Sequence, residues 1–351
     1  MDQKIDIRSM LPEELIEYFA TLGEPKFRAK QVFPRLMKGE RIADITNLSK
    51  ALRERLENET LDTLPAVEEK YVSKIDGTVK YLFKLYDGAC IESVFMKYKH
   101  GNTICISSQV GCRMGCKFCA STIGGRDRDL LPSELLGQII AAELDSGERV
   151  SNIVMMGIGE PLDNYDNVIK FLKLVNHPEG INIGYRHISL STCGVVPKIR
   201  ALAEVDIPIT LSISLHAATD EKRSEIMPVN NKWKIAELLS ACVDYYKVTG
   251  RRISFEYTLI LGKNDTDADA RELATLLKNA FRGTGAPIHV NLIRVNEVKE
   301  TGFKKGSDES AHAFAATLEK LGVVATVRRR LGADVNAACG QLRRKAQQGD
   351  I

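Results

Sequence analysis

The stretch CISSQVGCRMGCKFC, residues 105–119, decides how the rest of the chain is interpreted. Within it, Cys112, Cys116 and Cys119 form a C-x₃-C-x₂-C triplet, and the next cysteine along the chain is Cys193. A structural zinc site takes four protein ligands, usually as two separated pairs. An electron-carrying [4Fe–4S] cluster takes four thiolates. Three thiolates on a short loop therefore predict a [4Fe–4S] cluster with one iron open to an outside ligand, whereas three buried thiols or an incomplete zinc knuckle fit this tight spacing less well.

The composition is that of an ordinary globular protein with room for a main domain and an accessory one. The chain has 351 residues, of which 44% are hydrophobic and 27% charged. It has no apolar run long enough to span a bilayer, and it opens on the polar segment MDQKIDIRSM instead of a signal peptide. We therefore expect a cytoplasmic protein with no membrane partner, whose eight cysteines are mostly thiols.

The net charge of +3 says little about partners, but local basic runs say more. Each run alone is more often a solvated surface, and three runs around the predicted chemistry favour a nucleic-acid partner. The runs are residues 97–100, 328–330 and 343–345.

Residues 1–62 are predicted to form a helical accessory module that binds RNA or caps the main domain. Apolar residues recur at helical spacing in three segments of this module. These segments are residues 11–22, 26–33 and 48–56.

Residues 63–98 change to the alternating pattern of strands and are predicted to be a small β-sheet linker. Residues 71–75 and 79–83 flank the turn Asp76-Gly77, which is typical of a β-hairpin. A third strand over residues 90–96 leads into the cysteine segment.

Residues 99–345 alternate between strand and helix, followed by a short tail at 346–351. Repeated βα units imply parallel strands with right-handed crossovers, and six units predict an α/β partial (β/α)₆ barrel rather than a closed barrel of eight. Strands are expected to begin near residues 104, 152, 187, 209, 253 and 288, with a last one at 323–328. Helices are expected at residues 132–147, 164–176, 197–205, 233–249, 268–281 and 308–321.

Polar residues follow the predicted strand ends, where parallel βα folds collect ligand-binding groups. Gly159 and Glu160 follow one strand, Ser191 ends the next, Ser214 and His216 end a third, and Asn296 follows a later one. Glycine permits close backbone approach, a carboxylate accepts hydrogen bonds from an ammonium group, and hydroxyl, imidazole and amide groups suit a ribose, a carboxylate and an adenine edge. Each residue alone is more often a loop cap, but together they predict a binding site.

Two cysteines outside the triplet also point to chemistry. Cys339 lies in a loop of small residues near the C-terminus, a poor place for a core thiol and a good one for an exposed nucleophile. Cys105 lies seven residues before Cys112 and is therefore expected near the cluster.

The chain resembles the RlmN/Cfr family of radical-SAM RNA adenosine methyltransferases over essentially its whole length. The resemblance rests on the cysteine triplet and on the motifs GEP (159–161), SLH (214–216) and AACGQL (337–342). It implies a radical-SAM barrel, a [4Fe–4S] cluster and S-adenosyl-L-methionine, with two molecules of the latter used per turnover.

The resemblance also implies a role for each matching position. The cluster ligands would be Cys112, Cys116 and Cys119. The positions that bind S-adenosylmethionine would be Gly159, Glu160, Ser191, Ser214, Leu215, His216 and Asn296. Cys339 matches the cysteine that becomes S-methylated. Cys105 matches the second thiol, which deprotonates the RNA adduct and releases it by forming a transient disulfide with Cys339. Glu92 matches a proton acceptor, although taken alone it reads as a solvent-facing strand carboxylate.

The expected reaction is methylation of carbon 2 of adenosine in 23S rRNA, at the peptidyl-transferase centre, and in tRNA next to the anticodon. It would proceed through S-methylcysteine, in a monomer supplied with electrons by an external flavodoxin- or ferredoxin-type donor. Cfr-like methylation of carbon 8 is the alternative, because Arg294 stands where many carbon-2 enzymes carry proline, whereas GEP and His216-Ala217-Ala218 resemble the carbon-2 branch. A third hypothesis is an iron–sulfur protein that binds RNA or carries electrons, but it leaves Cys105 and Cys339 without a role.

Overall fold

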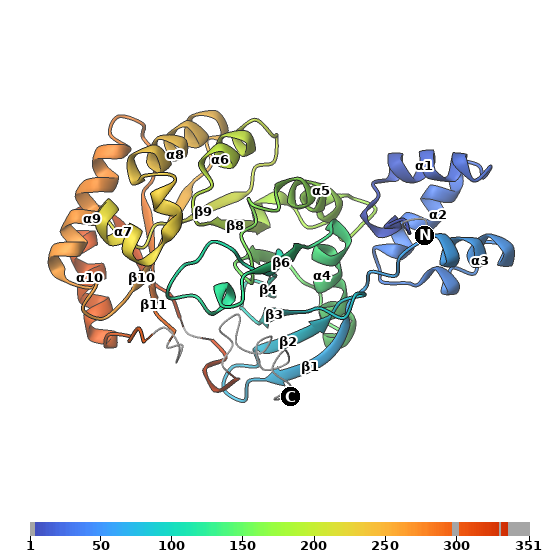
Figure 1. Ribbon diagram of the computed structural model, residues 1–351, viewed down its shortest axis with the longest axis horizontal. Helices are drawn as coiled ribbons and strands as arrows, with labels where there is room; N and C mark the ends of the chain where they lie inside the picture. The colour runs from blue at the N-terminus through green and yellow to red at the C-terminus, as the bar shows by residue number, and fades with distance from the viewer. Residues whose placement is uncertain (1–3, 297–301, 330, 336–351) are drawn as a thin grey trace.

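The computed structural model describes residues 4–296, 302–329 and 331–335, and three helices lie in the first sixty residues. They are α1 (Pro12–Thr21), α2 (Phe27–Leu36) and α3 (Lys50–Glu59), which gather at one end of the molecule, beyond the main sheet (Figure 1). Ser49 caps the start of α3, since its hydroxyl accepts a hydrogen bond from the Leu52 N–H at 3.2 Å. The predicted helical start of the chain is confirmed.

The antiparallel strands come next and join the main sheet directly. β1 (Ala66–Val72), β2 (Val79–Lys84) and β3 (Cys90–Met96) pair in sequence order, and β3 then pairs antiparallel with β4 (Thr103–Cys105). The antiparallel prediction is confirmed, but these strands extend one edge of the main sheet and do not form a separate linking sheet. The reason is the short connection after β3, which folds the chain straight back onto its neighbour.

The remaining strands of the main sheet are all parallel. After β4 they are β7 (Asn152–Met155), β8 (Ile188–Thr192), β9 (Thr210–Ser214), β10 (Ile253–Leu259), β11 (His289–Arg294) and β12 (Val324–Val327). The helices between them are α4 (Pro132–Ser146), α5 (Tyr165–Asn176), α6 (Val196–Ala203), α8 (Ile235–Thr249), α9 (Asp267–Ala280) and α10 (Asp308–Lys320), which cover the outside of the strands (Figure 1). Six βα units and a final strand are therefore confirmed. Among the described residues the sheet runs from β1 to β12 without closing.

Two short strands and one short α-helix were not predicted. β5 (Gln109–Gly111) and β6 (Arg126–Asp129) form a hairpin around the cysteine loop, and α7 (Asp220–Ile226) follows β9. Strands of three or four residues are too short to show periodicity, and α7 is polar enough to be read as a loop.

The two faces of the parallel strands differ, and the difference creates room for a ligand. On β8 and β9 the apolar residues, such as Leu190 and Leu211, are fully buried in the main core. The alternate residues are serines and one threonine, Thr210, and the Oγ atoms of Ser191 and Ser214 lie 3.4 Å apart. Since large branched residues usually fill the interior of a full barrel, small polar residues here leave a hollow, polar interior.

Candidate active site

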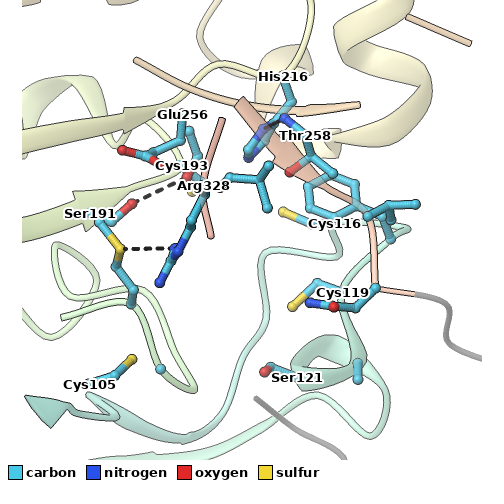
Figure 2. Close-up of a pocket in the computed structure, with 18 of the residues that line it drawn as sticks. Cys105, Cys116, Cys119, Ser121, Ser191, Cys193, His216, Glu256, Thr258 and Arg328 are labelled. Carbon is cyan, nitrogen blue, oxygen red and sulfur yellow. Dashed lines mark hydrogen bonds between the residues drawn. The ribbon is translucent and has the colours of Figure 1, made fainter. Parts of the chain in front are cut away.

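A cavity of about 570 Å³ opens at the carboxyl ends of the parallel strands (Figure 2). It brings together most of the residues singled out from the sequence, although they come from distant segments. Those that line it are Cys105, Cys112, Cys116, Cys119, Gly159, Glu160, Ser191, Ser214, His216 and Asn296. Glu92 and Leu215 do not line the cavity, and Cys339 lies outside the described residues.

The cysteine loop is held by its own turns and by a neighbouring helix. The Lys117 N–H donates to the carbonyl of Ile226, the last residue of α7, at 2.9 Å. The Thr122 hydroxyl lies 3.2 Å from the carbonyl oxygen of Cys116 and 3.0 Å from that of Cys119. These bonds hold the loop with its cysteines against the cavity.

Burial disfavours the thiolate form of Cys112 and Cys116 unless positive charge is supplied. It raises the pKa of Cys112 to about 12 and raises that of Cys116 well above the ordinary thiol value. A bound cationic cluster would reverse this effect. No three His, Cys, Asp or Glu side chains in the described segments converge on a point that suits a single metal ion. In an iron–sulfur cubane each thiolate binds its own iron, so separate thiols facing one cavity fit such a cluster better than a mononuclear site.

The glycines after β7 allow two segments of backbone to approach closely. Gly159 has a φ of +106°, and a Cβ there would lie 2.7 Å from the backbone N of Gln109. A Cβ on Gly157 would lie 2.6 Å from the carbonyl oxygen of Ile106. Only glycine fits either position without moving the backbone.

Glu160 is a buried carboxylate on the cavity wall, with an exposed fraction of 3%. Its two oxygens accept the backbone N–H groups of Cys193 at 2.7 Å and Leu162 at 3.0 Å. Burial raises its pKa, although these donors oppose the rise. A carboxylate held in this way can accept further hydrogen bonds from an ammonium group of a ligand.

The SLH motif contributes side chains and backbone. Ser214 and His216 line the cavity, whereas the Leu215 side chain is fully buried in the core. The Leu215 N–H donates to the carbonyl of Glu256 on β10 at 3.0 Å. Leu215 therefore shapes the site through its backbone.

His216 is held as a neutral imidazole. Its Nδ1 accepts the Thr258 N–H at 2.9 Å, which assigns the ring proton to Nε2. Burial lowers its pKa to about 3, so the ring is uncharged near neutral pH. The Phe118 ring packs edge-on against it with the centroids 5.0 Å apart, which links the SLH motif to the cysteine loop.

Arg223 is a site-forming residue that the sequence analysis missed. It is buried on α7 and donates to the carbonyls of Cys193 at 2.7 Å, Ser214 at 3.1 Å and Leu215 at 3.1 Å. Burial lowers its pKa. Arg223 therefore links the ends of β8 and β9. No local sequence pattern in the short helix predicts these hydrogen bonds.

Glu256 was also missed, although a signal was present. It lies on β10, lines the cavity, and accepts a hydrogen bond from the Asn291 amide at 2.6 Å. Burial raises its pKa. The alternation of Ser254, Glu256 and Thr258 along an otherwise apolar strand could have marked the inward face.

Glu92 lies below the cavity wall in an ion pair with Lys80, with its Oε2 3.0 Å from Nζ and both side chains fully buried. It occupies the same face of β3 as Val94 and Met96, which do line the cavity. It is therefore not the solvent-facing carboxylate that its sequence context alone suggests. Its role as a proton acceptor stays a prediction.

Cys105 ends β4, is 5% exposed and packs beside Val94 and Met96 on the cavity wall. Cys112, Cys116, Cys119, Cys193 and Cys242 are free thiols. Because Cys339 falls beyond the described residues, a Cys105–Cys339 disulfide remains a prediction.

The basic runs lie partly at the cavity. Arg328 and Arg329 line it, and Arg328 Nη1 lies 3.7 Å from the sulfur of Met156 (Figure 2). Arg330 and residues 343–345 lie outside the described residues. In the part of the chain that the structure covers, no helix is both long and apolar enough to cross a membrane.

Comparisons with family models divide the chain into two matched regions. Residues 5–61 match the ribosomal RNA large subunit methyltransferase N-terminal domain, and residues 106–277 match the radical SAM superfamily. The first match covers α1 to α3, and the second begins one residue after β4.

Individual relatives match along almost the whole chain. A protein of Alkaliphilus oremlandii (strain OhILAs), named "Probable dual-specificity RNA methyltransferase RlmN", is 55% identical over 99% of both chains. A protein of the same name from Clostridium botulinum (strain Eklund 17B / Type B) is 55% identical over 95% of this chain and 94% of its own. The crystal structure of a radical SAM methyltransferase from Sphaerobacter thermophilus, 39% identical, superposes with a TM-score of 0.90 over 96% of this chain and 98% of that one.

Proposed function

Because this chain belongs to the RlmN family of radical SAM RNA methyltransferases, we propose that it methylates carbon 2 of adenosine, both in 23S rRNA at the peptidyl-transferase centre and in tRNA next to the anticodon. One observation carries the proposal. A single cavity gathers three cysteines of one loop, the polar ends of four parallel strands and the separate thiol of Cys105.

The cysteine loop fits a [4Fe–4S] cluster. Cys112, Cys116 and Cys119 would be its ligands, and the raised pKa values of the buried thiols suit a group that brings its own positive charge. The cluster and S-adenosylmethionine, when bound, supply the methyl group and the radical that activates it, with two S-adenosylmethionine molecules per turnover and electrons from a flavodoxin- or ferredoxin-type donor.

The strand ends would orient S-adenosylmethionine. Glu160 would accept hydrogen bonds from its ammonium group, next to the close backbone approach at Gly159. Ser191 and Ser214 would offer hydroxyl groups to the ribose, and Asn296 would offer an amide to the adenine edge. His216 is neutral and donates from Nε2, so it adds a directed hydrogen bond without adding charge.

The two remaining cysteines would handle the methyl group. Carbon 2 of adenine is not nucleophilic, so a direct polar transfer to it should fail. Cys339 would instead accept a methyl group on its sulfur as S-methylcysteine. This methyl group would lose a hydrogen atom before its carbon joins the base, and the adduct would then lose one electron and one proton. The Cys105 sulfur would attack the sulfur of Cys339, which breaks the bond between that sulfur and the carbon; the carbon takes up a proton as the product leaves, and the external donor reduces the disulfide that remains. Cys105 is suited to this step because its thiol lies on the cavity wall. Glu92 would accept the proton that the base loses, and its Oε2 lies 3.0 Å from the Nζ of Lys80.

The RNA adenosine must leave its base stack to reach such a cavity. Arg328 and Arg329 line the cavity and would contact phosphates of the RNA entering it. The N-terminal helices are a second RNA-binding surface in this proposal, since the family model that matches them is named for a ribosomal RNA methyltransferase.

Methylation of carbon 8 is the alternative. It was considered because Arg294 stands where many carbon-2 enzymes carry proline. Arg294 lines the cavity and forms an ion pair with Asp308 in the first turn of α10, which leaves its side chain only one quarter exposed. The Arg294 guanidinium is therefore already paired with a carboxylate, and none of its contacts with the described residues favours carbon 8 over carbon 2.

The test is anaerobic reconstitution with iron and sulfide, followed by reaction with a reductant, isotope-labelled S-adenosylmethionine and either 23S rRNA fragments or tRNA. Digestion and mass spectrometry identify the product. 2-Methyladenosine in both RNAs supports the full proposal, and its absence from tRNA limits the substrate to rRNA. 8-Methyladenosine overturns the regiochemistry, and a Cys339→Ala variant that methylates normally overturns the S-methylcysteine route.

A further inference from the structure

Residues 331–335, which follow the last strand, lie against the turn between β1 and β2, far away in sequence (Figure 1). Asp334 accepts two hydrogen bonds from this turn, one from the Ser73 hydroxyl at 2.7 Å and one from the Lys74 N–H at 2.9 Å. In the opposite direction, the Gly332 N–H donates to Asp76 at 2.9 Å. Each side thus contributes one carboxylate, and we call this arrangement the Asp76–Asp334 clamp.

The turn that receives the segment is itself well defined. The Ser73 N–H donates to the carbonyl of Thr78 at 2.8 Å, and the Thr78 N–H donates to Asp76 at 3.0 Å. Gly77 has a φ of +72°, which the tight turn requires. The hydrogen bonds to Asp76 lower its pKa to about 2, and those to Asp334 lower its pKa as well. Both carboxylates therefore act as charged acceptors at neutral pH.

The clamped segment also forms part of the cavity. Leu331 packs against the small cluster of Val94, Met96 and Cys105, and both Leu331 and Gly332 line the cavity wall. The clamp therefore holds the chain beside the Cys105 thiol, at the edge where the antiparallel strands meet the parallel ones.

Chain length makes this position important for Cys339. Five peptide units separate Asp334 from Cys339 in the sequence. Such a tether spans at most about 18 Å between Cα atoms. An anchored Asp334 therefore restricts the volume that Cys339 can explore to the neighbourhood of the cavity and raises its effective concentration there.

We propose that the Asp76–Asp334 clamp positions Cys339 for its reactions at the cavity, with Asp334 as the principal positioning residue. This inference rests on the proposed function, because it presupposes that Cys339 reacts with S-adenosylmethionine and with Cys105. In this proposal the β1–β2 turn positions Cys339, which neither the cysteine loop nor the strand ends would do.

The experiment compares the holoprotein, prepared anaerobically, as wild type, Asp334→Ala and Lys74→Ala. Lys74→Ala is the matched control, since it removes a side chain from the same turn but keeps the backbone N–H that donates to Asp334. The first readout is the rate at which labelled S-adenosylmethionine methylates Cys339, followed by peptide mass spectrometry. In this step the thiolate sulfur gains the methyl group, the sulfonium carbon–sulfur bond breaks, and S-adenosylhomocysteine leaves.

The second readout is the rate of Cys105–Cys339 disulfide formation with diamide. The two thiols lose two protons and two electrons, which reduce diamide to its hydrazine, so this readout requires no methyl chemistry. Loss of the two hydrogen bonds to Asp334 should slow both reactions about tenfold. Formation of 5′-deoxyadenosine with an artificial reductant should stay within about twofold of wild type, because the clamp does not touch the strand ends or the cysteine loop.

Asp334→Asn keeps one acceptor oxygen. Its rates of Cys339 methylation and of disulfide formation should therefore lie between those of wild type and Asp334→Ala. The proposal is overturned if both Cys339 reactions have equal rates in wild type and Asp334→Ala. It is also overturned if Lys74→Ala slows the two reactions as much as Asp334→Ala does. If wild type does not methylate Cys339 at all, the proposed function fails, while the disulfide rates still decide whether the clamp positions this cysteine.

Discussion

The parallel strands β7 to β10 and the antiparallel edge β1 to β3 flank the same cavity but contribute to it differently. The parallel strands present side chains at their ends, where backbone donors such as the Cys193 N–H fix the carboxylate of Glu160. The antiparallel edge presents a strand face, with Val94 and Met96 on the wall and the Lys80–Glu92 pair buried beneath. Cys105 ends β4, the strand at which the two regions meet.

This difference suggests that the two regions contribute to different steps of the proposed reaction. The parallel region is built to hold a charged cofactor and a cluster, since its polar groups converge from several strand ends and from one loop. In the proposed reaction, the antiparallel region would carry out the thiol chemistry, with Cys105, Glu92 and the Asp76–Asp334 clamp that precedes Cys339 in the chain. Changes in the first region should abolish S-adenosylmethionine binding or cleavage, and changes in the second should spare cleavage.

The largest effect is expected from Cys116→Ala in the parallel region. Loss of one of three cluster ligands should remove the cluster and reduce both 5′-deoxyadenosine formation and RNA methylation to background. Iron content, the visible absorbance of the cluster and both product assays measure this. Cys90→Ala, at a half-buried cysteine on β3, is the control that should retain all of them. A Cys116→Ala protein with full iron content and normal cleavage would contradict the cluster assignment.

The next effect concerns the antiparallel region. Lys80→Met leaves the buried Glu92 carboxylate without its cation, and such a change should lower the free energy of unfolding by about 3–5 kcal/mol. Urea denaturation checks this prediction. The double variant Lys80→Met/Glu92→Leu removes both charges and should recover most of the loss. A single variant as stable as wild type would mean that the pair contributes little to this edge of the sheet.

Arg223→Lys tests the support beneath the strand ends. Lysine cannot reproduce the fork that reaches the Cys193, Ser214 and Leu215 carbonyls, so we expect a stability loss of about 1–3 kcal/mol and weaker S-adenosylmethionine binding. Denaturation with and without S-adenosylmethionine separates the two effects. Arg200→Lys, at a half-exposed arginine on α6, is the matched control and should change neither. If Arg223→Lys binds S-adenosylmethionine as wild type does, Arg223 supports only the stability of the fold and not the binding of this ligand.

The smallest effect is the pH dependence of Asp76. Its pKa is lowered to about 2, so it stabilises the fold above its ordinary pKa, and this contribution is lost as the pH falls from about 4 toward 2. Because the group is partly solvated, the contribution should stay below about 1 kcal/mol. Urea unfolding of wild type and Asp76→Asn should therefore differ at pH 6 and converge as the pH approaches the acid limit. A difference that grows on acidification would have the wrong sign for this explanation.

Local sequence determined a large part of this protein. The spacing of Cys112, Cys116 and Cys119 predicts the cluster loop without any fold, because ligands on one short loop are close by covalent connection. The alternation of strand and helix predicts six βα units, and parallel strands place their carboxyl ends at one edge, so the strand-end residues predicted from the sequence meet at one cavity. These features follow from contacts within a few residues or from a general rule of the architecture.

Tertiary structure alone decided which groups are buried together. The Lys80–Glu92 pair depends on the register of two antiparallel strands. The hydrogen bonds from Arg223 to the ends of β8 and β9 depend on where a short polar helix packs. The Asp76–Asp334 clamp joins a turn near the start of the chain to a segment near its end, and no local pattern encodes that contact. Hydrogen bonds and ion pairs of this kind need two partners from distant segments at bonding distance, so they appear only once the long-range packing is known.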